Sequence, residues 1–395
     1  MTGVVAAVPD AKRLRSNAWN RVESRGRSGL GVREPADPGT ATRASEAMST
    51  THATTRGSRS RTLTATLPGQ ICRAVRTNPT RTYRERDRLH SMTITEQPIE
   101  RIIPLGVPLD LRLTLLHLAR GPGDPTIRLA ASRAVRATRT PAGPATVHLE
   151  VSRSGLHART WGAGSAWLLE HVPALVGLDD APEALEPRHP VVGELARRLM
   201  GLRIGRTSRV IESLVPAILE QKVTGREASQ ALRGLIRRYG EKAPGPFDLR
   251  ILPPPELLAA LPYYAYHPLG VERRRADTVR WAAAHATRLE EIVDLPLEDA
   301  YRRLRALPGV GAWTAAEVAL RALGDTDAVS VGDFHIPNTV AWALAGEPRA
   351  TDERMLELLE PYRGQRGRVI RLLEAAGIGA PRFGPRMAPR AIAAI

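Results

Sequence analysis

One segment of this chain constrains its fold more than any other. Residues 304–315 read Leu-Arg-Ala-Leu-Pro-Gly-Val-Gly-Ala-Trp-Thr-Ala, which predicts that one helix ends before Pro308 and another begins at Ala312. Gly309 and Gly311 leave backbone N–H groups uncovered at the start of the second helix, where phosphate oxygens can approach them. A Pro-Gly-x-Gly turn alone is also compatible with an ordinary tight turn between helices. The longer string is far more specific.

The rest of the chain predicts a mainly α protein with a small α+β domain. Its 395 residues, 43% of them hydrophobic, are enough for two or three domains with real cores. We expect a disordered basic tail over 1–98 and a small α+β domain with an antiparallel sheet over 99–182. A helical domain over 183–378 and a C-terminal tail over 379–395 complete the predicted layout.

The small domain is predicted from short β-like runs separated by turn residues. Pro141-Ala-Gly-Pro144 and Ser152-Arg-Ser-Gly155 are hairpin-type turns between such runs. Asp110 is placed to cap a short helix through residue 118, and residues 164–176 form a second helical pattern. The predicted strands cover residues 126–129, 134–140, 145–151 and 156–161.

The helical domain is predicted from many short helices with different spacings. Thr224 and Glu227 form a capping box that opens a helix to about Tyr239. The absence of long heptads and of a fixed-period repeat favours a globular bundle over a coiled coil or solenoid. The other predicted helices cover residues 257–261, 276–285, 297–304, 312–323, 334–344, 352–359 and 366–375.

The charge of the chain favours a polyanionic partner, most often nucleic acid. Lysine and arginine number 57 against 41 acidic residues, a net charge of +16. Residues 1–91 hold 17 basic and 7 acidic residues, so +10 lies there and +6 in the remainder. This Arg- and Ser-rich stretch is suited to gripping DNA or to targeting an organelle; an over-long gene model, with Met92 as the true start, is the alternative.

Several classes of protein are excluded by composition. The single cysteine, Cys72, excludes disulfides within the chain, a cysteine-held zinc site and a four-cysteine iron–sulfur cluster. His267 and His335 are isolated and lack metal-ligand spacing. No apolar run approaches the ~18 residues of a membrane helix, and the N-terminus lacks the pattern of a secretory signal.

Three ordered motifs resemble the helix-hairpin-helix DNA glycosylase superfamily. The hairpin at residues 304–315 is followed by Val329-Ser-Val-Gly-Asp333-Phe334-His-Ile336, which resembles the segment carrying the family's catalytic aspartate. Upstream, Ala217-Ile-Leu-Glu-Gln221-Lys222-Val223 resembles the helix end that fills the gap left by an extruded base. A small sheet domain before these helices matches the 3-methyladenine DNA glycosylase II branch. The resemblance covers roughly residues 100–376.

The resemblance implies that Asp333 is the catalytic residue. Breaking an N-glycosidic bond places positive charge on the sugar, which a nearby carboxylate stabilises electrostatically. The carboxylate can also orient water for attack at C1′. The structural alternative is that Asp333 is simply the N-cap of a helix beginning at Phe334. Glu317 is the second candidate carboxylate.

The resemblance places Trp313 in the base pocket. Related lyase-type glycosylases have a Schiff-base lysine at this position, and an indole cannot be that nucleophile. A tryptophan face can instead stack on a flipped, cationic alkylated purine, unless it only packs between helices. Glu317 and Gln365 occupy positions where the family's type enzyme leads us to expect aromatic residues. The remaining candidates for the pocket are Phe334, Trp342 and Tyr362.

The DNA-binding residues are also implied by the resemblance. Gln221 and Lys222 are the expected wedge, with an exposed helix end as the alternative; Glu220 replaces a small residue. The hairpin residues expected to contact DNA are Gly309, Val310, Gly311 and Thr314. By resemblance alone, the backbone carbonyls of Arg305, Leu307 and Val310 are candidate ligands of a structural monovalent cation. No other cofactor is expected, and no iron–sulfur cluster.

We therefore predict a monofunctional glycosylase that excises 3-methyladenine-type purines from damaged double-stranded DNA. It is expected to be a monomer without a membrane partner, cytoplasmic and associated with the nucleoid through DNA. The alternatives are another damaged base on the same fold, or a non-catalytic protein that binds DNA damage. The missing lysine argues against oxoguanine-type lyases, and the missing cysteines against relatives with an iron–sulfur cluster.

Overall fold

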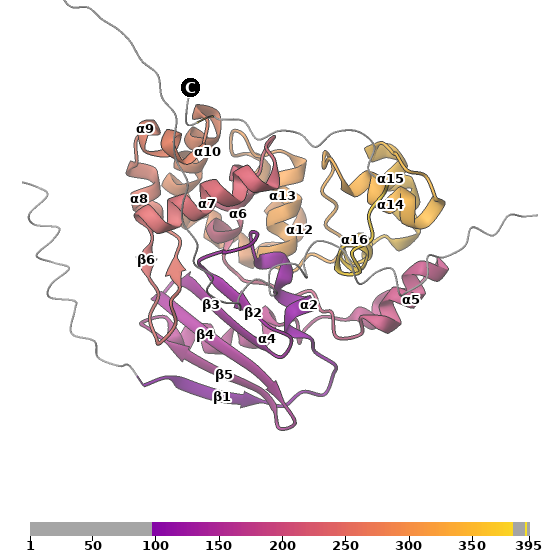
Figure 1. Cartoon of the computed structure of the whole chain (residues 1–395), viewed down its shortest axis with the longest axis horizontal. Helices are drawn as coiled ribbons and strands as arrows, with labels where there is room; N and C mark the ends of the chain where they lie inside the picture. Colours follow the sequence, from indigo (N-terminus) through magenta and orange to yellow (C-terminus); the bar gives the residue numbers. More distant parts are fainter. Residues whose placement is uncertain (1–96, 382–391, 393–395) are drawn as a thin grey trace, which may run out of the picture. The chain divides into compact units, whose positions relative to one another are not determined.

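Five strands form an antiparallel sheet at the start of the described chain. The computed structural model describes residues 97–381 and 392, so the two predicted tails lie almost wholly outside the described residues (Figure 1). The strands lie in the order β1-β5-β4-β3-β2. Their bounds are Ile99–Ile103 (β1), Ile127–Leu129 (β2), Arg133–Thr140 (β3), Gly143–Ser152 (β4) and Gly155–Trp161 (β5).

The two predicted hairpin turns set the register of the sheet. Thr140 pairs with Gly143, and Ser152 pairs with Gly155, so each loop holds two residues. Gly155 has a φ of +126°, and a Cβ there would lie 2.4 Å from the Ile103 carbonyl oxygen, which explains the glycine. Strand β1 was not predicted. It is an edge strand with four exposed residues, so its sequence lacks the alternation that reveals a half-buried strand.

Short helices pack on the sheet. Asp110 caps α2 (Leu111–Leu115) through a 2.9 Å hydrogen bond from the Leu113 N–H, as predicted. The helix predicted over 164–176 is split into α3 (Ser165–Glu170) and α4 (Val172–Leu175) at His171. Pro173 explains the break, because proline has no N–H to continue the helix. The core between these helices and the sheet is formed by Leu111, Leu115, Val147, Leu149, Leu156, Leu168 and Val172.

A bundle of helices forms a second core beside the sheet (Figure 1). The predicted capping box is present and opens α7 (Gly225–Tyr239). The bundle's core includes Leu214, Ile218, Leu235, Val279, Leu304 and Val318. Its main helices are α6 (Val210–Leu219), α7, α10 (Arg273–Ala284), α12 (Leu297–Arg305) and α13 (Ala312–Val318), and α13 continues as a π-helical turn over Ala319–Leu323.

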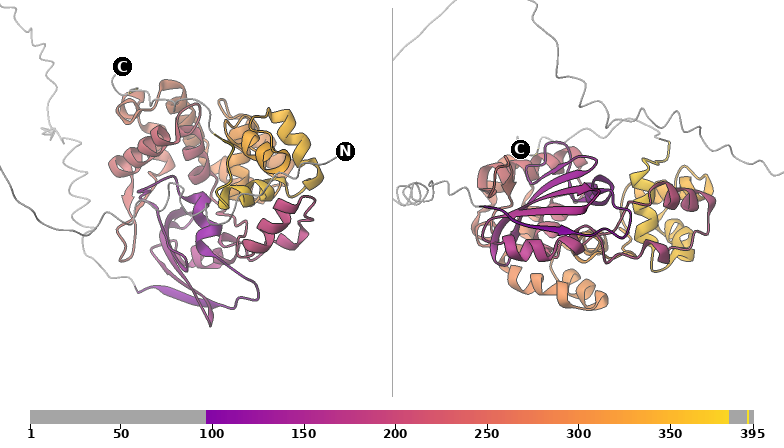
Figure 2. Two further views of the ribbon diagram at one scale, coloured as in Figure 1. Left: turned by 45° about the vertical axis from the view of Figure 1, so that its right-hand side comes forward. Right: turned by 90° about the horizontal axis from the view of Figure 1, so that it is seen from below.

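A third core joins α5 (Pro190–Arg198) to the C-terminal helices. Figures 1 and 2 both place α5 beside α16, and the two helices are in contact. The C-terminal helices are α14 (Ile336–Ala345), α15 (Asp352–Leu359) and α16 (Arg366–Ala375). The smaller elements are α8 (Pro255–Ala260), α9 (Tyr263–Tyr266), α11 (Ala286–Glu290), short 3₁₀ turns and a two-stranded ribbon of β6 (Glu241–Lys242) and β7 (Arg250–Ile251).

The prediction of a mainly helical chain with a small antiparallel sheet is confirmed, and the boundary at residue 182 stays a prediction. The predicted start of α14 at Phe334 is wrong, because the helix begins at Ile336. The Asp333 carboxylate accepts the His335 and Ile336 N–H groups. These two donors therefore bind a side chain, in place of the backbone carbonyls that an earlier helical turn would supply. Among the described residues, no helix combines the length and hydropathy needed to cross a membrane.

Candidate functional site

The predicted hairpin is present between α12 and α13. The Val310 N–H donates to the Leu307 carbonyl at 3.0 Å and closes the turn. Gly309 has a φ of +86°, and a Cβ at this position would lie 2.4 Å from Thr278 Oγ1 on α10. Gly311 is the N-cap of α13 and has open space where a Cβ would lie. The hairpin therefore packs against α10 at Gly309 and exposes its backbone at Gly311.

The other two residues predicted to bind DNA at the hairpin are buried. Val310 is 6% exposed and Thr314 is 2% exposed. Their side chains therefore serve the core rather than a DNA surface, and a phosphate contact at either position would have to use the backbone.

Asp333 lies in the loop before α14, and its carboxylate is held from two sides. Oδ1 accepts the N–H groups of His335 at 2.7 Å and of Ile336 at 2.9 Å. Oδ2 accepts the indole N–H of Trp313 at 3.0 Å. An ionised carboxylate offers about four lone-pair sites, so one site on Oδ2 remains for a further charge or donor. Asp333 thus accepts two N–H groups at the start of α14, although it is not the N-cap of a helix beginning at Phe334, and it still has capacity for chemistry.

Trp313 and Thr314 are adjacent on the first turn of α13, and each binds a different segment. Trp313 binds Asp333, whereas the Thr314 hydroxyl accepts the Gln221 amide N–H at 2.8 Å. The same amide donates to the Gly309 carbonyl at 2.9 Å. The first turn of α13 therefore brings together the three motifs that the sequence singled out.

The predicted wedge follows α6. Gln221 is half-buried against the hairpin, whereas Lys222 is exposed and has a left-handed φ of +54°. This backbone conformation is uncommon for a residue other than glycine and turns the chain sharply after Gln221. Glu220 pairs with Arg120, with its two oxygens 3.0 and 2.8 Å from Nη1. Sequence reasoning missed this anchor because its two halves lie 100 residues apart.

The residues at the two expected aromatic positions have other partners. Glu317 is buried, and its carboxylate accepts from Ser330 at 2.7 Å and from Arg321 at 2.6 Å. Gln365 accepts from Arg368 at 2.6 Å. The three remaining pocket candidates differ in exposure: Phe334 is 82% exposed, Trp342 is 38% exposed and Tyr362 is 4% exposed. The role of Phe334 in binding a base stays a prediction, and on this geometry its ring faces solvent beside His335.

The carbonyls proposed for a monovalent cation lie at the hairpin turn. The Leu307 carbonyl already accepts the Val310 N–H, which leaves one lone pair for a cation. The Leu307 carbonyl therefore keeps capacity for a cation, and a cation held by the backbone carbonyls of Arg305, Leu307 and Val310 stays a prediction. No group of three or more His, Cys, Asp or Glu side chains within residues 97–381 is arranged to hold a metal.

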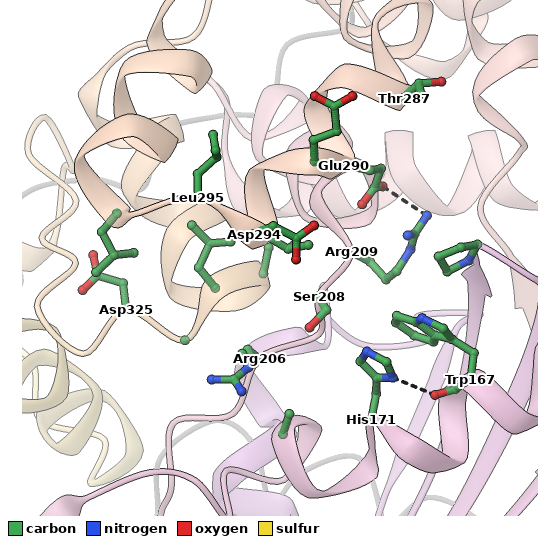
Figure 3. Close-up of a pocket in the computed structure, with 18 of the residues that line it drawn as sticks. Trp167, His171, Arg206, Ser208, Arg209, Thr287, Glu290, Asp294, Leu295 and Asp325 are labelled. Carbon is green, nitrogen blue, oxygen red and sulfur yellow. Dashed lines mark hydrogen bonds and ion pairs between the residues drawn. The ribbon is translucent and has the colours of Figure 1, made fainter.

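A large pocket of about 870 Å³ lies away from these residues (Figure 3). It is lined by Trp167, His171, the segment before α6, α11 and the residues that follow the π-helical turn. Arg209 pairs with Glu290 at 3.2 Å in its wall. None of the predicted site residues lines this pocket. Since α6 and α12 run from this pocket toward the wedge and the hairpin, and α13 runs back from the hairpin to the pocket, the pocket lies at the opposite end of the bundle.

No protein-family model matches the chain. A Mycobacterium tuberculosis protein, named as a probable bifunctional transcriptional activator and DNA repair enzyme AlkA, is 30% identical over 219 residues; the match covers 47% of this chain and 43% of the relative. Escherichia coli DNA-3-methyladenine glycosylase 2 is 29% identical over 174 residues, covering 44% of this chain and 60% of the relative. The chain thus spans about half the length of these curated relatives.

Two solved structures share the fold. A 3-methyladenine DNA glycosylase from Archaeoglobus fulgidus has a TM-score of 0.59 at 18% identity, covering 71% of this chain and 98% of that one. The MBOgg1 protein in complex with a low-affinity DNA ligand has a TM-score of 0.55 at 16% identity, with the same coverage. The fold is that of the helix-hairpin-helix DNA glycosylases. The sequence relatives confirm the resemblance to the 3-methyladenine DNA glycosylase branch.

Proposed function

We propose that the chain is a monofunctional DNA glycosylase that hydrolyses the N-glycosidic bond of alkylated purines in duplex DNA, with 3-methyladenine as the leading substrate. The observation that carries the proposal is the 3.0 Å hydrogen bond from Trp313 Nε1 to Asp333 Oδ2. It joins the hairpin helix to a carboxylate that keeps an unused lone pair. The name of the Escherichia coli relative, DNA-3-methyladenine glycosylase 2, supports a methylated purine as the substrate class.

The proposed reaction uses the positive charge of the damaged base. When the C1′–N bond breaks, the bonding electron pair stays with the alkylated purine and neutralises it, while positive charge develops on the sugar. The Asp333 carboxylate stabilises this oxocarbenium-like state. Water then attacks C1′, loses its proton to the carboxylate or to solvent, and leaves an abasic site. Because the base departs as a neutral molecule, the reaction needs no general acid.

The proposed DNA contacts surround Asp333. Lys222 is exposed beyond the hairpin-bound Gln221, so its aliphatic stem can fill the gap in the duplex while its ammonium group meets a phosphate. The backbone N–H groups at Gly311 and the start of α13 offer a phosphate contact, since the first N–H groups of a helix lack intrahelical partners. The Trp313 ring is partly exposed, and we expect it to stack on the extruded cationic purine.

Hydrolysis is expected without strand cleavage. A lyase needs an amine at the sugar, and the lysines of the chain are Lys12, Lys222 and Lys242. Lys242 lies in β6, away from the hairpin, and Lys12 lies outside the described residues. Borohydride should therefore trap little covalent enzyme–DNA complex. Efficient trapping that disappears in Lys222→Ala would show that the wedge lysine is a nucleophile and that the enzyme is bifunctional.

The experiment that tests the function is mass analysis of the bases released from methylated duplex DNA. We expect 3-methyladenine to be released fastest, with 7-methylguanine as an internal comparison. Parallel duplexes with oxidised or deaminated bases test the other specificities of this fold. DNA binding without release of any base would assign the chain as a damage-binding protein and overturn the proposal.

A further inference from the structure

Glu317 is a buried carboxylate that the proposed reaction does not use. It follows Trp313 by four residues on α13, so both side chains lie on the same face of the helix. Trp313 donates to the Asp333 carboxylate, and Glu317 Oε1 accepts the Ser330 hydroxyl at 2.7 Å. One helix face therefore holds the loop over residues 330–333 at both ends.

The loop between these two attachments is a tight turn. The Asp333 N–H donates to the Ser330 carbonyl at 3.1 Å, and Gly332 between them has a φ of +94°. The Gly332 N–H donates to Asp352 Oδ2 at 2.9 Å. Because the turn is short and closed by a backbone hydrogen bond, a shift of Ser330 moves Asp333 with it.

Glu317 is itself fixed. Its Oε2 accepts Arg321 Nη1 at 2.6 Å, and Arg321 Nε donates to the His117 carbonyl at 3.0 Å. Burial would by itself raise the pKa of Glu317, but Arg321, Ser330 and Arg120 outweigh burial and hold this pKa below its ordinary value. The ionised carboxylate can only accept hydrogen bonds, so Ser330 must donate and the direction of the bond is fixed.

We propose that Glu317 and Ser330 are positioning residues for Asp333. Glu317 anchors Ser330, and the closed turn transmits that position to the carboxylate beside Trp313. The chain thus uses a loop anchor where the resemblance leads us to expect an aromatic wall of the base pocket. The catalytic consequence rests on the proposed function, whereas the positional consequence does not.

The positional consequence is tested by the indole N–H of Trp313. The chain has six tryptophans, so the signal is identified by its loss in Trp313→Phe. In Ser330→Ala, which removes one hydroxyl, we expect the exchange of this N–H with solvent to rise about 2- to 10-fold, the range of one modest hydrogen bond. An unchanged exchange rate would overturn the inference, whether or not the protein excises bases.

The control is Glu212→Gln. Glu212 and Glu317 side chains are both 12% exposed and both bind arginine, since Glu212 pairs with Arg136 at 2.8 Å. Glu212 lies on α6 against the sheet rather than on the loop. Glu212→Gln should therefore lower stability without changing the exchange of the Trp313 N–H. If Glu212→Gln and Ser330→Ala raise the exchange of the Trp313 N–H by similar factors, the effect comes from a general loss of stability, and the inference is overturned.

The catalytic consequence is tested by single-turnover excision of 3-methyladenine. We expect Ser330→Ala to lower the rate about 10-fold, with little change in affinity for a duplex containing an abasic-site analogue. In an Asp333→Asn background it should cause no further loss, because it acts through that carboxylate. Equal losses in both backgrounds would show a role independent of Asp333.

Glu317→Gln should retain more activity than Glu317→Ala, since its amide oxygen can still accept from Ser330. If the wild type releases no base, the proposed function fails while the exchange measurement still decides the positioning role.

Discussion

The two oxygens of the Asp333 carboxylate have different tasks. Oδ1 caps α14, and Oδ2 binds Trp313 and faces the proposed reaction. Asp333→Asn can keep the cap through its amide oxygen but loses the negative charge and places an N–H against the indole N–H. We expect a stability loss of about 1 kcal/mol and a rate loss of ~10²–10³. Thermal denaturation and single-turnover excision measure the two effects.

The same variant separates an enzyme from a binding protein. Affinity for an abasic-site analogue should weaken far less than the rate, because the hairpin and Lys222 are unchanged. A folded Asp333→Asn protein that excises bases at the wild-type rate would contradict the mechanism. Glu317, the second carboxylate that the sequence nominates, would not be a ready substitute, since it is buried and bound to Arg321 and Ser330.

His117 makes stability depend on pH. Both ring nitrogens are buried, and neither has a hydrogen-bond partner at good geometry among the described residues, so the Thr114 backbone offsets the burial only weakly. Burial first, and then Arg371, Arg321 and Arg120, hold the pKa of His117 well below its ordinary value of 6.5. Below about pH 6.5 the unfolded chain therefore binds a proton here that the native state does not, and native stability falls as the pH falls.

We expect this residue to account for a loss of up to roughly 1.4 kcal/mol per pH unit below pH 6.5. Urea denaturation of the wild type and His117→Leu between pH 7.5 and 5.5 measures the effect. The difference between the two proteins isolates His117, because His148, whose pKa is also lowered by burial and Arg159, titrates in both. Parallel stability profiles for the two proteins would show that the pKa of His117 is the same in the native and the unfolded state, and would contradict this expectation.

At the scale of elements, the two hairpin glycines have separable roles. Gly309 has a left-handed backbone and a close neighbour in Thr278, whereas a Cβ at Gly311 meets nothing within 4 Å. Gly309→Ala should lower stability by at least about 1–2 kcal/mol from backbone strain. Gly311→Ala should change stability by less than about 0.5 kcal/mol. It should nevertheless weaken DNA binding, because the methyl group covers the N–H groups offered to phosphate.

Urea denaturation and titration of a damaged duplex measure these two effects. Gly311→Ala that binds DNA as tightly as the wild type would remove the hairpin backbone from the interface. Gly309→Ala with unchanged stability would mean that α10 moves away from the hairpin at little cost.

Helix starts that depend on a few consecutive residues were predicted correctly. The capping box at Thr224 and the Asp110 cap each need only a few consecutive residues, and both helices begin where predicted. Strand β1 was missed because its pairing with β5 joins residues about 60 positions apart and leaves its own side chains exposed. The start of α14 was misplaced because Asp333 acts as a cap two residues earlier than a standard N-cap.

The sequence predicted which residues belong to the candidate site, but not the hydrogen bonds that connect them. The spacing of the motifs nominated Asp333, Trp313 and Gln221 separately. The bond between Trp313 and Asp333 depends on how the chain between α13 and α14 folds back, and the bonds of Gln221 depend on how the end of α6 meets the hairpin. The sequence encodes neither arrangement locally. The same holds for Glu220 and Arg120, whose pairing crosses from the helical bundle to the segment after α2. Nothing local marks such long-range pairs.

At the scale of the whole molecule, three helices orient the site. The C-terminal ends of α6 and α12 and the N-terminal end of α13 meet at the wedge and hairpin. Lys222 and Arg305 are exposed there, at the end of the bundle opposite the large pocket. Cationic groups at one end suit a polyanion that lies across the bundle, so both this end and the basic N-terminal segment are expected to contribute to DNA affinity.

These two contributions are separable, because the charge is unevenly distributed along the sequence. Residues 1–91 have a net charge of +10, and the remainder has +6. The wedge, the hairpin and Asp333 all lie within the described residues. A variant beginning at Met92 should therefore excise bases at the wild-type rate under single turnover. It should bind DNA more weakly at low salt, and the slope of log affinity against log salt should become shallower by about 0.9 for each phosphate that the shortened protein no longer neutralises. Affinity titrations from about 50 to 300 mM salt, with excision measured at saturating protein, test both expectations.

A Met92 variant that is folded but cannot excise bases at any salt concentration would show that the N-terminal segment is part of the catalytic unit. An unchanged salt slope would show that its charge does not meet DNA.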